Sequence, residues 1–268
     1  MEGSWKTGFI RSGPILLEYK MQARAGKPWL LFLHGYGQDY TAFHPVYEVA
    51  ASDFSFLAVH LPLHGESIIE RKGILSKEEW ASCLEELLGR LATGPVRAIA
   101  FSMGAKFLLA ATEKKPALFT ELILLAPDGL VMNPWYGLAT GTTAGRLLLR
   151  IFIRLFPAFR WLISFLAAMR IVRPALKRFA FAELGSSMGR NRVLDVWLLF
   201  RKLWPDLNLL SEQCRNKPVR VIVYLGRFDG ILPLSRYSRI MNRESWMQWK
   251  ILKTGHAGLI EEFARHHL

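Results

Sequence analysis

Four short motifs, each directly after an apolar run, contain the residue types that nucleophilic catalysis needs. A serine hydroxyl is a weak nucleophile until a nearby base takes its proton, and a histidine held by a carboxylate can be that base. Glycine-rich turns beside such a serine let the backbone approach a substrate and point an N–H group at it. The motifs are HGYG at 34–37, AFSMG at 100–104, GRFDGILP at 226–233 and GHAG at 255–258.

The apolar runs before these motifs predict strands that are buried on both faces of a mostly parallel sheet. Helix-length stretches separate the runs, and the capping box of Ser76 and Glu79 predicts a helix that reaches about Leu91. Because the carboxyl ends of parallel strands meet at one edge of a sheet, we expect the four motifs to gather there. The predicted strands are 28–35, 54–61, 96–101, 121–126 and 219–226, with an antiparallel opening pair at 6–11 and 15–21 and a last strand at 248–254.

The motifs and their order, serine then aspartate then histidine, resemble those of the α/β-hydrolase superfamily of lipases, esterases and small-molecule hydrolases. The resemblance covers roughly residues 28–130 and 217–268. It implies an α/β fold with a mostly parallel eight-stranded sheet flanked by helices, and a helical cap insertion. The chain departs from the family pattern at Ala100, where glycine is usual, and in the loop HLPLHGES at 60–67, which lacks the family's aspartate and first glycine.

The resemblance implies a role for each reactive residue. Ser102 is the expected nucleophile, His256 the base that takes its proton, and Asp229 the carboxylate that orients the imidazole. The backbone N–H groups of Tyr36 and Met103 are expected to face the developing oxyanion. The product would be an acyl-enzyme that water resolves, in ester or thioester chemistry with no metal and no organic cofactor.

Asp128 competes with Asp229 for the role of triad acid. It also follows an apolar run, in APDG at 126–129, and some members of the family take their acid from that earlier strand. The pattern Gly-x-x-Asp-x-x-x-Pro favours Asp229. His34 is expected to be structural in the oxyanion loop, and the histidines at 44, 60, 64, 266 and 267 are expected to be surface or loop residues.

The stretch 132–216 differs in composition from the rest of the chain. Between residues 131 and 215 there are 13 Lys and Arg against four Asp and Glu, which accounts for most of the net charge of +13. Hydrolases of this superfamily often carry a helical insertion at this place. We therefore expect residues 132–216 to form a cap, or lid, on a core made by residues 1–131 and 217–268.

Within the insertion, the segment 147–172 is very apolar but carries arginines. Arg146, Arg150 and Arg154 recur every four residues and so share one helix face, and the opposite side offers Leu147, Leu148, Ile151, Phe152 and Leu155. Pro157 and Pro174 are expected to divide the segment into separate helices. Two interpretations stay open: an ordinary cap whose apolar side covers the pocket, or an amphipathic helix that contacts an anionic membrane surface. Nucleic-acid binding is not expected, because no recognised module is present.

The aromatic residues of the insertion favour a small hydrophobic substrate. The candidates for the pocket lining are Phe152, Phe156, Phe159, Phe165 and Trp197. We expect a serine hydrolase that cleaves carboxylic esters with an apolar acyl or alcohol part. A thioesterase and a carbon–carbon hydrolase or lyase with the same triad remain alternatives. A non-catalytic membrane-associated binding module is less favoured, because none of the three triad positions is altered.

Composition limits the class of protein further. With 51% hydrophobic and 21% charged residues over 268 positions, the chain is too apolar for an intrinsically disordered protein. Cys83 and Cys214 are its only cysteines, so no disulfide framework is expected and a reducing compartment is predicted. The first 25 residues lack a secretory signal pattern. Together these features predict a cytoplasmic protein, with peripheral membrane contact as a possibility raised by the basic insertion.

Overall fold

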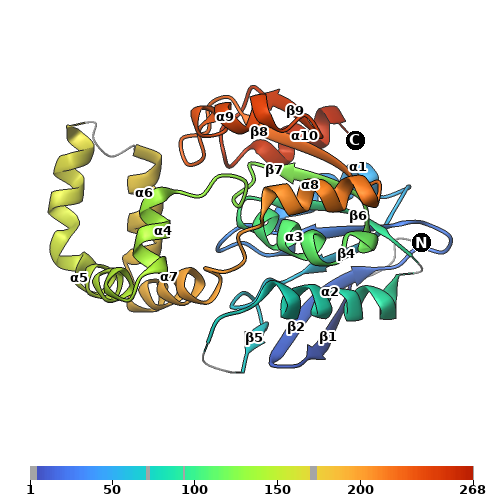
Figure 1. The fold of residues 1–268 in the computed structure, drawn as a ribbon, viewed down its shortest axis with the longest axis horizontal. Helices are drawn as coiled ribbons and strands as arrows, with labels where there is room; N and C mark the ends of the chain where they lie inside the picture. The colour runs from blue at the N-terminus through green and yellow to red at the C-terminus, as the bar shows by residue number, and fades with distance from the viewer. Residues whose placement is uncertain (1–4, 71–72, 93, 170–173, 268) are drawn as a thin grey trace.

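The computed structural model describes residues 5–70, 73–92, 94–169 and 174–267, and over these residues it contains one sheet of nine strands (Figure 1). The eight strands expected from the apolar runs are all present, with ends shifted by a few residues. The ninth, β5, has two residues and pairs with β2 at the margin of the sheet. The strands are Lys6–Ser12 (β1), Ile15–Gln22 (β2), Trp29–Leu33 (β3), Ser55–Val59 (β4), Ile68–Ile69 (β5), Val96–Phe101 (β6), Phe119–Leu125 (β7), Arg220–Gly226 (β8) and Met247–Leu252 (β9).

The sheet is mixed, and its parallel part carries the site. The strand order is β1-β2-β4-β3-β6-β7-β8-β9. The pairs β1–β2 and β2–β4 are antiparallel, and every pair from β4 to β9 is parallel. The carboxyl ends of β3, β6, β8 and β9 therefore lie along one edge, as the four motifs predict.

Helices cover both faces of this sheet. Successive residues of each parallel strand point to opposite faces, and both sets are mostly apolar. One face packs against α2 and α3, together with α8, and the other packs against α1 and α10 (Figure 1). The core helices are His44–Ala50 (α1), Lys77–Leu91 (α2), Met103–Lys114 (α3), Leu207–Asn216 (α8), Ser238–Arg243 (α9) and Leu259–His267 (α10), with short 3₁₀ helices at Tyr40–Phe43, Pro116–Leu118 and Leu234–Arg236.

The start of α2 confirms the expected capping box. The Ser76 hydroxyl accepts from the Glu79 N–H, and the Glu79 carboxylate accepts from the Ser76 N–H. The helix ends at Leu91, as predicted. Its Trp80 indole donates to the Phe107 carbonyl at 2.8 Å, which ties α2 to the helix that follows Ser102.

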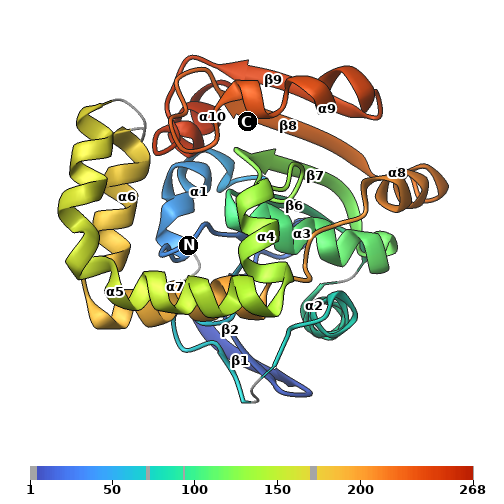
Figure 2. The ribbon, with the colours of Figure 1, turned by 60° about the vertical axis from the view of Figure 1, so that its left-hand side comes forward.

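Four helices between β7 and α8 form a layer to one side of the sheet (Figure 2). We call them the insertion helices. They are Pro134–Gly141 (α4), Thr143–Ala168 (α5), Pro174–Leu184 (α6) and Ser187–Leu199 (α7). The last part of the expected cap, α8, packs against α3 instead, and its Leu210 and Cys214 lie in the core under the sheet. The separate layer therefore ends at α7.

Pro157 does not end a helix, which corrects the expectation that it would. α5 continues through Pro157 to Ala168 and bends sharply part-way along its length (Figure 2). A proline removes one hydrogen bond, here the bond to the Ile153 carbonyl, and its ring pushes the preceding turn away, so a kink is the expected consequence. Pro174 does begin a separate helix, α6, and residues 170–173 lie outside the described residues.

Candidate active site

Ser102 occupies a strained turn between β6 and α3. Its φ of 50° and ψ of −114° lie in a region that residues with a side chain rarely adopt. The turn is held because the Ser102 N–H donates to the Leu125 carbonyl and the Ser102 carbonyl accepts from the Asp128 N–H, both at 2.9 Å. A Cβ on Gly104 would lie 2.2 Å from the Leu33 carbonyl oxygen, so the turn requires glycine two residues after the serine.

His256 and Asp229 meet at the ends of β9 and β8. The His256 Nδ1 lies 2.6 Å from the Asp229 Oδ2. The other carboxylate oxygen of Asp229 accepts from the N–H groups of Ile231 and Leu232, both at 2.8 Å. The Asp229 side chain is fully buried. A buried carboxylate fixed by two N–H groups can hold the imidazole in one orientation and stabilise its positive charge.

Asp128 lies close to different partners. Its carboxylate contacts the Lys106 Nζ at 3.3 Å and the Arg236 guanidinium at 3.8 Å. Asp229 is therefore the carboxylate that contacts His256, and Asp128 is the counterion of Lys106 and Arg236.

Ser102 and His256 line one cavity of about 350 Å³, together with Tyr36 and Met103. Within the described part of the chain, no hydrogen bond joins the Ser102 hydroxyl to His256. Such bonds often tighten only when substrate binds. Met103 begins α3, so its N–H has no partner within the helix and belongs to the positive end of the helix dipole. The cavity thus brings together four of the five residues for which the sequence predicts a catalytic or oxyanion role, and the fifth, Asp229, contacts His256.

Two buried histidines hold the loop that contains Tyr36. The His34 Nε2 accepts from the Leu61 N–H at 3.1 Å, and its Nδ1 lies 2.7 Å from the Gly35 carbonyl. The His64 Nε2 accepts from the Gly37 N–H at 3.1 Å. Each ring accepts at Nε2, which requires the neutral form with the proton on Nδ1. Two neutral imidazoles therefore join the loop at 60–67 to the loop at 34–37.

Burial favours the same neutral state. It is the main cause that lowers the pKa of His34 to about 3, and the nearby His64 lowers it further. Burial also lowers the pKa of His64 below the usual value for histidine. The phenol of Tyr36 shows the opposite effect, because burial and the Glu183 carboxylate raise its pKa. All three groups are therefore neutral at pH 7.

We predict that His34 makes the fold sensitive to acid. The unfolded chain protonates this histidine near pH 6.5, whereas the folded chain does so only near pH 3. The unfolded state therefore binds more protons in this window, and the free energy of unfolding should fall by about 1.4 kcal/mol per pH unit as the pH drops below 6.5. Urea denaturation at several pH values in this range measures the free energy of unfolding. It should decrease less steeply with falling pH in His34→Gln than in the wild type. His44→Gln, at an exposed position on α1, is the comparison variant.

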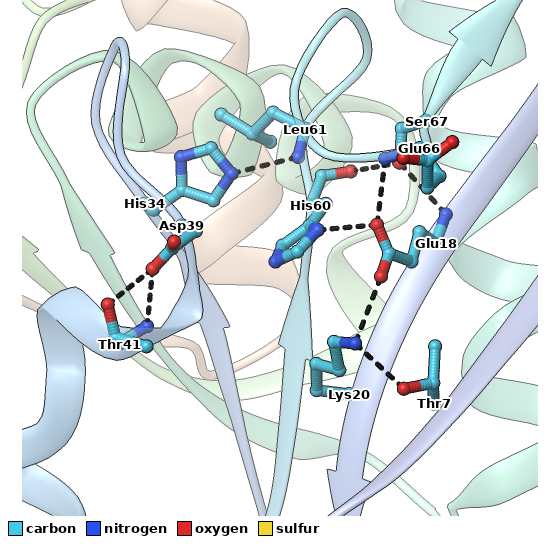
Figure 3. A network of polar contacts seen from close by, with 10 residues as sticks. All are labelled: Thr7, Glu18, Lys20, His34, Asp39, Thr41, His60, Leu61, Glu66 and Ser67. Carbon is cyan, nitrogen blue, oxygen red and sulfur yellow. Dashed lines mark hydrogen bonds and ion pairs between the residues drawn. The ribbon is translucent and has the colours of Figure 1, made fainter.

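A polar network behind this loop was not foreseen from the sequence (Figure 3). The buried Glu18 carboxylate in β2 contacts the His60 Nδ1 at 2.7 Å, the Glu66 N–H at 2.8 Å and the Lys20 Nζ at 3.1 Å. Ser67 donates to the His60 carbonyl and accepts from the Glu18 N–H. Burial alone would raise the pKa of Glu18, but the hydrogen bonds from Glu66, His60 and Lys20 hold it below its usual value.

His60 and His64 were expected to be surface or loop residues. They lie in the loop at 60–67 and are buried, with 6% and 5% of their surface exposed. His60 stands where the family pattern has aspartate, and Glu18 supplies the carboxylate from the neighbouring strand. Leu63 stands where the pattern has glycine and adopts a φ of 69°, the left-handed conformation that glycine favours. In the part of the chain that the structure describes, no group of three or more His, Cys, Asp or Glu side chains could hold a metal ion.

Comparison with known proteins decides the family. The model of the alpha/beta hydrolase family matches residues 30–265, which is most of the chain. The chain belongs to the alpha/beta hydrolase family. Both the sheet and the placement of Ser102, Asp229 and His256 at the ends of its strands agree with this assignment.

Individual relatives of this alpha/beta hydrolase are distant. An uncharacterized hydrolase, YugF, from Bacillus subtilis (strain 168) is 25% identical over 124 residues, which span 46% of this chain and 45% of that protein. Among solved structures, a membrane phospholipase A described as a bacterial virulence factor has a TM-score of 0.66 at 17% identity, covering 98% of this chain and 84% of the other. Naproxen esterase (carboxylesterase NP) from Bacillus subtilis has a TM-score of 0.62 at 14% identity, covering 98% and 89%. At these identities the solved structures show the fold alone.

The aromatic residues predicted to line the pocket of the hydrolase separate into three groups. Trp197 lines the cavity that contains Ser102. Phe152, Phe156 and Phe159 line a second cavity among the insertion helices, which also includes Trp197. Phe165 lines neither of these two cavities, and 56% of its surface is exposed.

Sequence reasoning missed a buried cation in the hydrolase cavity. Lys106 lines the cavity with its side chain almost fully buried, and its Nζ lies 5.7 Å and 5.4 Å from the ring centres of Tyr136 and Trp204. Lys106 lies four residues after Ser102 on α3, which is one helical turn, so the spacing could have indicated a place beside the serine. Asp128 compensates the buried charge of Lys106.

Proposed function

We propose that this alpha/beta hydrolase cleaves carboxylic esters with an apolar acyl or alcohol part. Ser102 Oγ attacks the ester carbonyl while His256 takes the hydroxyl proton, and the resulting imidazolium gives that proton to the departing alcohol. This leaves an acyl group on Ser102. Water then attacks the acyl-enzyme with His256 again as the base, which releases the carboxylic acid and restores the serine.

The negative charge of each tetrahedral intermediate would be stabilised by backbone donors. The N–H groups of Met103, at the start of α3, and of Tyr36, in the loop held by His34 and His64, are the proposed pair. Each such donor is worth about 2.7–4 kcal/mol in comparable hydrolases. Asp229 stabilises the imidazolium through its 2.6 Å contact with Nδ1.

One observation carries this proposal. His256, held by the buried carboxylate of Asp229, lines the same cavity as a serine whose backbone is strained into a strand-to-helix turn. The aromatic residues Phe101, Tyr136, Trp197 and Trp204 of the lining favour an apolar substrate. The naproxen esterase and the phospholipase among the similar structures, to judge by their names, support the choice of ester.

A thioester, or a carbon–carbon bond next to a carbonyl, would use the same three residues. The test is a comparison of p-nitrophenyl esters with acyl-thioesters of the same acyl chain, together with labelling of Ser102 by a fluorophosphonate. The proposal predicts labelling of Ser102 and a higher kcat/KM for the esters. Labelling without ester turnover would favour the thioester or carbon–carbon reaction, and absence of labelling would argue for a non-catalytic binding module.

A further inference from the structure

The second cavity lies within the insertion, beside the catalytic cavity. It has a volume of about 530 Å³ and is lined by residues of α5, α6 and α7. Its charged lining residues are Lys177 and Glu183, and the rest of the lining is apolar. A cavity of this size and composition is typical of a site for an apolar ligand.

Two residues connect this cavity with the chemistry. Val193 and Trp197 line both cavities, so the two cavities adjoin at these side chains. Glu183 lines the second cavity and interacts with the phenol of Tyr36, which lines the first. An acyl group attached to Ser102 that extends past Trp197 would therefore enter an apolar space.

We infer that the second cavity receives the distal part of a long alkyl chain in the acyl group of the substrate. This inference rests on the proposed ester hydrolysis and narrows the substrate class to long-chain esters. Burial of each further methylene in this cavity stabilises the transition state together with the bound substrate. The kcat/KM for p-nitrophenyl esters should therefore rise as the acyl chain lengthens.

The experiment fills the cavity from α6. Ala180 lines it, so Ala180→Trp should lower kcat/KM for a long-chain ester at least tenfold, the effect of displacing about two methylenes, while a short-chain ester is unaffected. Ala182→Trp, at an exposed position on the same helix, is the matched control and should change neither. Ala180→Leu is a milder filling variant for use if the tryptophan prevents folding, and short-ester turnover reports on the fold.

The outcomes separate the two proposals. Unchanged long-chain hydrolysis by both Ala180 variants, or no dependence of the wild type on chain length, would overturn the acyl-chain site and leave ester hydrolysis standing. Failure of the wild type to hydrolyse any ester would instead contradict the proposed function itself.

A different observation concerns the opposite side of α5. By length and composition, α5 is the one helix among the described residues that could cross a membrane, yet only 11% of its most apolar stretch is buried. Leu149, Ile153 and Phe156 face the protein. The sequence allowed an interpretation in which Leu147, Leu148, Ile151, Phe152 and Leu155 cover the pocket. All five are 45–65% exposed, and only Phe152 lines one of the two cavities.

Before the bend, α5 presents an apolar stripe beside positive charge. Leu147, Ile151 and Leu155 recur every four residues on the exposed side, and Leu148 extends the stripe. Arg150 and Arg154 are exposed next to it, and α5 contains no acidic residue. The guanidinium of Arg146 is less available to contact another molecule, because it donates to the carbonyls of Thr140 and Gly141 at the end of α4.

We propose that this face of α5, made by Leu147, Leu148, Ile151, Leu155, Arg150 and Arg154, docks on the surface of an anionic lipid bilayer. The apolar side chains would enter the boundary between headgroups and acyl chains, and the two guanidinium groups would contact the phosphates. The helix would lie on the membrane and not cross it, because its arginines would be costly at the bilayer centre and Pro157 bends it. This proposal is independent of the catalytic activity.

Co-sedimentation with phosphatidylglycerol-containing vesicles tests the docking. Arg150→Gln with Arg154→Gln should weaken binding roughly thirtyfold at low salt, and added salt should weaken wild-type binding. Arg239→Gln with Arg265→Gln removes the same charge from exposed positions on α9 and α10 and is the matched control, expected to bind as the wild type does. Leu147→Ser with Ile151→Ser should also weaken binding at least tenfold, because insertion of the stripe is lost.

Two results would overturn this docking. One is the absence of wild-type binding to these vesicles at low salt. The other is equal loss of binding in the α5 and control arginine variants, which would indicate attraction by net charge alone. If Leu147→Ser with Ile151→Ser converts a dimer to a monomer in analytical ultracentrifugation and leaves vesicle binding unchanged, the face is an interface between two copies of the chain.

Discussion

Replacement of Ser102 by alanine is expected to abolish fluorophosphonate labelling and to lower kcat for an ester by about 10⁶-fold, the loss that follows when a hydrolase triad loses its nucleophile. Alanine keeps the Cβ and removes only the hydroxyl, so the hydrogen bonds of the Ser102 backbone to Leu125 and Asp128 remain. The variant should therefore fold as the wild type does. Steady-state kinetics and mass spectrometry of the labelled protein measure both effects.

Ser102→Gly supplies a second inactive variant with a different expected stability. Glycine adopts a positive φ without strain, so this change should raise the free energy of unfolding by up to about 1 kcal/mol, whereas Ser102→Ala should leave it unaltered. Urea denaturation distinguishes the two. Ester turnover by either variant at the wild-type rate would contradict the assignment of Ser102 as nucleophile.

Replacement of Asp229 by asparagine is expected to lower kcat by about 10⁴-fold, as in serine proteases that lose the corresponding carboxylate. The amide keeps the shape of the side chain but removes the charge that lies 2.6 Å from the His256 Nδ1. An amide nitrogen can also donate to Nδ1 and so favour the wrong tautomer. The pH dependence of kcat, measured together with kcat itself, should show the loss of activity at every pH where the wild type is active.

Asp128→Asn is the comparison variant. Its carboxylate contacts Lys106 and Arg236 and not His256, so kcat should be retained. The free energy of unfolding should decrease, because the buried ammonium of Lys106 loses its counterion. A large loss of kcat in Asp128→Asn with little change in Asp229→Asn would indicate that Asp128, which follows the earlier strand β7, is the triad acid.

The strands were predictable because each buried parallel strand is a short apolar run that ends at a glycine or polar residue. That rule predicts that HGYG, the serine turn, Asp229 and His256 lie at one edge of the sheet. The strand rule alone does not separate Asp128 from Asp229, since both follow strands, and it was the pattern Gly-x-x-Asp-x-x-x-Pro that favoured Asp229. The choice depends on distances between side chains, and it is the loop after β8 that directs Asp229 towards His256.

Other features depend on contacts between distant residues. Glu18 reaches His60 across 42 positions because β2 and β4 pair, and no local pattern in the sequence indicates this. The sequence also did not indicate which side of α5 faces the protein, since apolar residues occur on both of its sides. Only packing against α6 and α7 determines that Ile153 is buried and Ile151 is exposed. Pro157 shows that a helix-breaking residue can bend an element without ending it.

The neutral histidines that hold the loop at 34–37 bear on how the proposed catalysis depends on acid. His34 and His64 accept hydrogen bonds at Nε2, and burial lowers the pKa of both, so both rings are neutral at pH 7. In the proposed mechanism the proton transfers are therefore left to His256, the histidine that lines the cavity with Ser102. The acid side of a rate profile should accordingly fit one ionisation over the range where the protein stays folded, and solvent isotope effects on kcat can be assigned to this one imidazole.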